Sequence, residues 1–212
     1  QHRLILSWQF FVVDPADDNA VVEVVILPES ASTRRIGLMT ALWAVVVSAG
    51  LYEHPLVADG VTAQGVARPM FWSDDPKERE ESLSKFKIPL VLACHTGTAD
   101  LTTFNIDGFG FDHLTRLTSA GGGLFSLFPL KLRESGLNSY WHKALSVTVV
   151  DTMTQAPAGS RALKILGETC GVPKIKLPDG VIEKMDKYRD DDFLGFLEYG
   201  INDARIVVEY LS

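Results

Sequence analysis

Cysteine is scarce in this chain, which has only Cys94 and Cys170 among its 212 residues. Two thiols are too few for a disulfide framework or for a zinc site built from cysteines. Both lie in apolar stretches, where a free cysteine usually packs as a small hydrophobic side chain. Because no signal peptide is recognisable either, we expect a cytoplasmic protein.

The chain also lacks a long hydrophobic run and a surplus of positive charge. The apolar run at 38–51 is 14 residues long, whereas a membrane-spanning helix needs about 20. We therefore expect a buried helix there and no membrane partner. The net charge of −7 argues against a broad basic surface for duplex DNA. It is compatible with an acidic metal site that only the end of a single DNA strand enters, through a narrow opening.

What the chain does have is the composition of a packed α/β domain. Hydrophobic residues make up 46% and charged residues 22%, and this length fits one large domain or one domain with an insertion. Apolar patterning predicts strands at 4–13, 21–27, 88–94 and 145–150, the first two forming a hairpin. The order of strands and helices favours a mixed sheet flanked by helices, with 88–94 as a central strand and 51–87 as a loop or helical insertion.

The C-terminal residues predict a long amphipathic helix. Its apolar stripe consists of Phe193, Phe196, Leu197, Ile201, Ala204, Val208 and Leu211. The same helix places Tyr199 one turn before Asp203, and residues four apart are stacked on one helix face. Asp100 lies one turn into a shorter predicted helix that follows the strand at 88–94. Carboxylates at such strand and helix ends converge at one edge of a sheet, so we expect Asp100 and Asp203 to meet.

Converging carboxylates suit phosphodiester hydrolysis. Two metal ions roughly 4 Å apart orient the attacking water and stabilise the leaving oxygen, and hard divalent cations need several carboxylate oxygens. Asp100 and Asp203 could supply two such ligands, and the Tyr199 hydroxyl could hold the water. His95 is either a core histidine or a substrate contact. Asp151 could bind metal, but the favoured role is to order the backbone at a strand end.

The order and spacing of these residues resemble the DEDDy 3′–5′ exonucleases, in the form found in organellar- and viral-type family B DNA polymerases. The Tyr-x-x-x-Asp pair matches the third exonuclease motif, and the segment 91–104, with its His and its Ala-Asp-Leu, matches the second. Residues 151–175 resemble the stretch before the third motif, and 6–10 resemble the second strand of that fold. Lys174 lies in the former stretch; it could touch a phosphate, as could Lys176, but solvated lysines are the default expectation for both.

The resemblance implies a ribonuclease H-like α/β fold that removes nucleotides from the 3′ ends of single-stranded DNA. Asp100, Tyr199 and Asp203 would be catalytic, with both aspartates holding two Mg²⁺ or Mn²⁺ ions. His95 and Phe104 would contact the substrate, Phe104 by stacking on a base, although packing in the core is the more common role of such a ring. In a longer polymerase such a domain would proofread. The alternative is an exonuclease-like module that binds nucleic acid or protein without turnover, and no feature of the sequence separates RNA from DNA.

The family's first motif, Asp-x-Glu at the end of the first strand, has no match before the region 7–13. We expect that strand upstream of Gln1, since the sequence begins with Gln and not with Met. A second account uses Asp14, with Asp17 nearby, as a substitute, although Pro15 makes a hairpin tip the more natural interpretation. A third account is a domain that has lost catalysis.

Overall fold

The computed structural model describes residues 5–14, 17–28, 35–50, 75, 77, 88–104, 130–132 and 145–212. The chain divides into two compact units. The first comprises Gln1–Arg35, Ala93–Thr103 and Asp151–Ser212, and the second comprises Ile36–Leu92 and Phe104–Val150. The predicted insertion at 51–87 lies outside the described residues except for 75 and 77. A single exonuclease-like domain over 1–212 stays a prediction.

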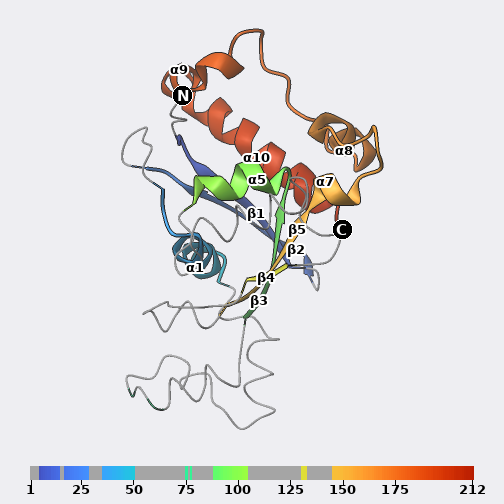
Figure 1. Ribbon diagram of the computed structural model, residues 1–212. Coiled ribbons are helices and arrows are strands. Elements are labelled where there is room, and N and C mark those ends of the chain that lie inside the picture. The colour runs from blue at the N-terminus through green and yellow to red at the C-terminus, as the bar shows by residue number, and fades with distance from the viewer. Residues whose placement is uncertain are drawn as a thin grey trace. The chain divides into compact units, whose positions relative to one another are not determined.

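The first unit begins with the predicted hairpin, which Figure 1 shows in blue. β1 (Trp8–Asp14) pairs antiparallel with β2 (Asp17–Ile26). Aromatic and β-branched residues are common in both strands, and such residues favour a pleated, half-buried backbone. β2 begins at Asp17 and not at Val21, because Asp14 and Asp17 already pair across the turn. Asp14 therefore lies at the end of a hairpin.

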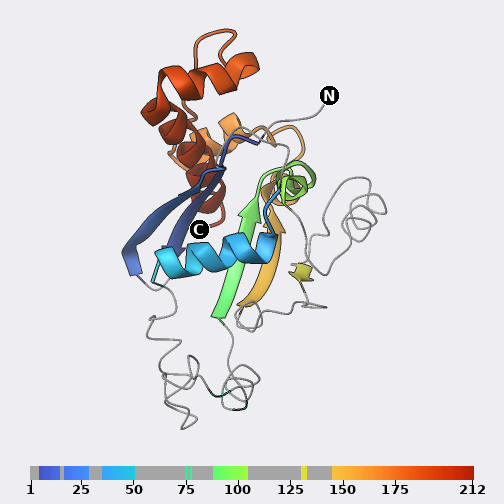
Figure 2. The same ribbon diagram turned by 90° about the vertical axis from the view of Figure 1, so that its left-hand side faces the viewer.

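The helices of the first unit gather on α10 (Phe193–Glu209), which packs against β1 (Figure 2). α8 (Leu163–Thr169) and α9 (Met185–Asp191) both contact α10. Asp192 precedes α10, and its carboxylate accepts a hydrogen bond from Gly195 N at 2.9 Å, which satisfies an amide that the first helical turn leaves unpaired. The shorter elements of this unit are α5 (Gly97–Asp100), η2 (Leu101–Thr103), α7 (Thr152–Gln155) and η4 (Ile182–Lys184).

The core of the first unit forms where α10 meets α8. One cluster of buried side chains contains Ala156, Leu166, Val172 and Ile206. The residues buried along α10 are Phe196, Ile201, Ile206 and Val207. The predicted stripe contains the first two of these and omits the last two. α10 contacts β1 as well as α8, and a helix covered by two neighbours buries more than one stripe.

The second unit contains α1 (Leu38–Ser48) and most of a three-stranded sheet, in the order β3 (Ile88–Cys94), β5 (Leu145–Asp151), β4 (Leu130–Leu132). β4 and β5 are antiparallel. α1 is the predicted buried helix. The prediction of a central position for 88–94 is wrong for the described sheet, since β5 has a neighbour on each side and Val91 on β3 is 70% exposed. A continuous apolar run predicts a strand but does not fix its place in the sheet.

The described strands form one two-stranded and one three-stranded sheet, and not the single mixed sheet expected from the sequence. Helices and strands are both present, and the ribonuclease H-like arrangement stays a prediction. Within the described ranges, no helix combines the length and the apolar character that crossing a bilayer requires.

Candidate functional site

The turn between β3 and α5 carries two of the predicted site residues. α5 follows the strand as predicted and ends at Asp100. The Asp100 carboxylate reaches back along the turn, where Oδ2 accepts a hydrogen bond from His95 N at 3.1 Å. Between them, Thr96 adopts a left-handed conformation with φ 61° and ψ 58°. This turn therefore fixes the Asp100 carboxylate relative to the main chain of His95.

Asp151, the last residue of β5, is 3% exposed and is bonded to the same turn. Its Oδ1 accepts hydrogen bonds from Thr96 N at 3.1 Å and from Met153 N at 2.9 Å, and its Oδ2 accepts one from Gly97 N at 2.7 Å. A buried carboxylate is stable only with such partners. The expectation that Asp151 orders the backbone at a strand end is confirmed.

Thr152 orients the His95 ring. The two residues are joined between His95 Nδ1 and Thr152 Oγ1 at 2.8 Å, and Thr152 Oγ1 donates to Cys94 O at 3.2 Å. Because a hydroxyl has one hydrogen, its oxygen accepts from the Nδ1–H of His95, which leaves Nε2 as an acceptor. Burial lowers the pKa of His95 and Lys174 adds to this effect, while Asp151 and Asp203 oppose it. His95 is thus a neutral ring near neutral pH, and its Nε2 carries the lone pair.

α10 carries the other two predicted site residues, and Lys174 contacts both. Lys174 Nζ lies 2.6 Å from Asp203 Oδ2 and 5.1 Å from the centroid of the Tyr199 ring. Burial alone would lower the pKa of Lys174, but hydrogen bonding to Asp203 and Tyr199 and their charges raise it. Lys174 is therefore not the solvated lysine that the sequence predicts. The one indication in the sequence that Lys174 could have a functional role was its position in residues 151–175, which resemble the exonucleases.

The pKa values of both predicted carboxylate ligands, Asp100 and Asp203, are raised, and the charge of Asp203 acts on Asp100 whereas Asp100 is not among the causes of the shift at Asp203. Burial raises the pKa of the Asp100 carboxyl to about 6; the hydrogen bond from His95 N opposes this rise, and the charges of Asp151 and Asp203 add to it. Burial also raises the pKa of Asp203, against the opposing effects of Lys174 and His95. Asp100 is exposed as a residue even though neighbouring atoms surround its carboxyl group, so water weakens both the charge effects and the rise in its pKa. That Asp100 and Asp203 meet at one cation stays a prediction.

The oxygen donors of this cluster fit part of a site for a hard divalent cation. Asp203 Oδ1 is buried and has no hydrogen-bond partner among the described residues, and a buried acceptor without a partner is costly. The charge of Asp203 acts on the carboxyl group of Asp100, which is the second predicted ligand. Within the described ranges, no group of three His, Cys, Asp or Glu side chains is arranged to hold a metal. Asp100 and Asp203 therefore supply only some of the ligands that Mg²⁺ or Mn²⁺ prefers.

Two other residues considered from the sequence lie outside this cluster. Phe104 is 9% exposed, so its ring packs in a core and offers little surface for stacking on a base. Asp14 pairs with Asp17 at the hairpin end, as the hairpin interpretation predicts. Among the described residues, the groups that shift the pKa values of Asp100 and Asp203 do not include Asp14.

Comparison of the chain with protein-family models, with curated proteins and with solved structures finds no match. The exonuclease resemblance stays a prediction, and the function below is argued from the contacts of the cluster formed by His95, Asp100, Lys174, Tyr199 and Asp203.

Proposed function

We propose that this chain is a metal-dependent 3′–5′ exonuclease that acts on the ends of single-stranded DNA. Where a polymerase region accompanies it, the same activity would proofread. The observation that carries the proposal is the carboxylate of Asp203, whose buried Oδ1 has no hydrogen-bond partner among the described residues while its Oδ2 pairs with Lys174. Tyr199 and Lys174 lie beside Asp203. Acidic side chains gathered next to a phenol and an ammonium group suit hydrolysis of a phosphodiester.

The two aspartates would hold Mg²⁺ or Mn²⁺. Asp203 offers its Oδ1 for this purpose, since Lys174 already pairs with Oδ2. When bound, such ions lower the pKa of the attacking water and stabilise the charge that develops on the leaving oxygen. The proposal also requires the Asp-x-Glu pair that the exonuclease resemblance implies, because Asp100 and Asp203 do not complete a ligand set.

Tyr199 would align the attacking water through its hydroxyl, as the exonuclease resemblance implies. Lys174 supports this role because it contacts both Tyr199 and Asp203. It holds the two α10 side chains in a common orientation and adds a positive charge where the scissile phosphate would carry a negative one. A lysine between the phenol and the carboxylate thus suits both positioning and charge stabilisation.

His95 would contact the terminal nucleotide as a hydrogen-bond acceptor. Its Nδ1–H is used by Thr152, so its Nε2 can accept a hydrogen bond from a donor such as the terminal sugar hydroxyl. Single or frayed strands would be preferred, since a paired end must first be opened at a cost of a few kcal/mol.

A second candidate is a binding module on the same scaffold that lacks turnover. The ion pair between Lys174 and Asp203 favours it, because it neutralises a carboxylate that a cation would otherwise use. Such a module would bind a nucleic-acid strand without cleaving it.

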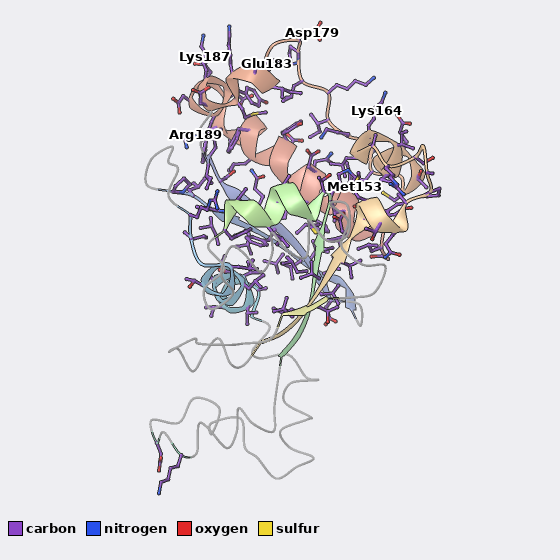
Figure 3. All side chains as sticks on the ribbon, in the orientation of Figure 1. Met153, Lys164, Asp179, Glu183, Lys187 and Arg189 are labelled. Carbon is purple, nitrogen blue, oxygen red and sulfur yellow. The ribbon has the colours of Figure 1, made fainter. Side chains whose placement is uncertain are left out.

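One assay separates the two candidates. The intact gene product is incubated with Mg²⁺ and 5′-labelled single-stranded DNA, beside Asp203→Asn and the control Asp179→Asn, which changes an exposed carboxylate in the same way. Figure 3 shows Asp179 well apart from Met153, whose main-chain amide is bonded to Asp151 beside the candidate site. The exonuclease proposal predicts a ladder of shortened DNA that is lost only in Asp203→Asn. DNA binding without shortening in all three proteins would favour the binding module, and an RNA oligonucleotide in parallel tests substrate class.

A further inference from the structure

The carboxylate of Asp151 caps the N-termini of two short helices, α7 and α5. By accepting from Met153 N, it caps α7, the helix that follows it. By accepting from Gly97 N, it also bonds the first amide of α5. The residue that should cap α5 by position, Thr96, makes no side-chain cap hydrogen bond. Asp151 therefore takes over the capping of a helix that begins 54 residues earlier in the chain.

This contact holds the turn in a conformation that its own sequence disfavours. Thr96 has a positive φ, and β-branched residues seldom adopt that region because the side chain crowds the backbone. Both Thr96 N and Gly97 N point to the Asp151 carboxylate. Two charge-assisted hydrogen bonds to a buried acceptor can hold a backbone in such a state.

The same turn sets both candidate residues that it carries. His95 N donates to the Asp100 carboxylate across this turn, with Thr96 in its left-handed conformation between them. Thr152, the neighbour of Asp151, fixes the His95 ring through Nδ1. The end of β5 thus controls the position of the Asp100 carboxylate and the direction of the His95 ring.

We infer that Asp151 is a positioning residue of this site, which acts by clamping the turn at Thr96 and Gly97 and thereby holds the Asp100 carboxylate in place against the main chain of His95. The effect on catalysis rests on the proposed function, whereas the clamp on the turn does not. The alternative is that Asp151 serves only as the N-cap of α7.

The variant Asp151→Ser separates these two roles. Serine is as good a helix N-cap as aspartate, so it keeps the bond to Met153 N, but its shorter side chain does not reach Thr96 and Gly97. The matched control is Asp192→Ser, which makes the same change at the N-cap of α10. Should Asp151→Ser fail to fold, Asp151→Asn keeps the size of the side chain and removes one acceptor oxygen.

Two readouts on the intact protein test the inference. In Asp151→Ser, hydrogen exchange at the amides of Thr96 and Gly97 should accelerate by about ten-fold or more, the change expected for one lost charge-assisted hydrogen bond, while amides in the middle of α10 keep their rates. The Mg²⁺ concentration for half-maximal DNA shortening should rise by roughly ten-fold, because Asp100 is misplaced. A mere loss of folded protein lowers the rate without moving that midpoint. Asp192→Ser should change neither quantity.

Unchanged exchange at both amides would overturn the inference, and so would faster exchange with an unchanged Mg²⁺ midpoint. If the wild-type protein does not shorten DNA at all, the proposed function fails and the positioning role fails with it. The exchange rates still show in that case whether Asp151 clamps the turn, so the two failures are distinguishable.

Discussion

Lys174 Nζ lies 2.6 Å from Asp203 Oδ2, which joins the segment after α8 to the middle of α10. Charge-assisted hydrogen bonds of this length are among the stronger interactions in proteins. Both side chains are 26% exposed, so solvent weakens the pair without removing it. The contact holds in place the carboxylate on which the proposed cation site depends.

Replacing Lys174 by Met should lower the free energy of unfolding by about 1–2 kcal/mol, because Asp203 then loses its partner while still half-buried. The pKa of Asp203 should rise further, since Lys174 opposes the effect of burial. Urea denaturation and an NMR titration measure the two changes. The control is Lys164→Met; Lys164, labelled in Figure 3, lies 3.9 Å from Glu168, and the two side chains are 60% and 59% exposed. This substitution should cost less than about 0.5 kcal/mol, and equal losses in both variants would contradict the importance given to Lys174.

Asp100 should make the metal-free protein less stable as pH rises. Its pKa is 3.8 ordinarily and about 6 in the fold, so the folded state binds the proton more tightly. The stability contributed by protonated Asp100 is fully present below pH 3.8 and is lost as pH rises through about 6. Thermal melting across this window should show a steeper fall for wild type than for Asp100→Asn, which cannot titrate. Parallel curves for the two proteins would show that Asp100 has its ordinary pKa.

Two helical glycines should respond differently to alanine. Each substitution gains helix propensity, but a Cβ at Gly167 would collide with the main-chain carbonyl oxygen of Val172 and would crowd Ile206. Backbone cannot move aside easily, so Gly167→Ala should destabilise the protein by about 1–3 kcal/mol. At Gly200 the collision is with the end of the Gln9 side chain, which can rotate away, and the cost should be smaller. Chemical denaturation compares them, and an equal or greater loss at Gly200 would be contrary to this packing.

Local patterns were sufficient for the hairpin, for α1 and for the turn and helix that carry Asp100, because alternation, apolar runs and turn residues act over a few positions. That Asp100 and Asp203 meet stays a prediction. Local patterns failed where the deciding contact is distant in the chain. The resemblance of the stretch around Lys174 to the exonucleases suggested a phosphate contact at most, and it did not predict that Lys174 pairs with Asp203, 29 residues away.

The place of β3 in its sheet and the second buried side of α10 depend likewise on distant neighbours. An apolar run predicts burial but not which element supplies it, so Val91 is exposed where a central strand was expected, and Ile206 is buried where the stripe omitted it. The hydrogen bonds from Thr96 and Gly97 to Asp151 also depend on residues that are distant in the sequence. The carboxylate of Asp151 could be predicted to order backbone, but the 54-residue reach to Gly97 could not.

The most direct test of the central claim is whether Asp100 and Asp203 share one cation. Mn²⁺ binding to the intact gene product can be measured by calorimetry for wild type, Asp100→Asn, Asp203→Asn and the double variant. A shared site predicts that each single substitution weakens the same binding event and that the double variant loses much less than the sum of the two, since residues that act on one ligand are not additive. Strictly additive losses, or Mn²⁺ binding that survives either substitution unchanged, would contradict the account.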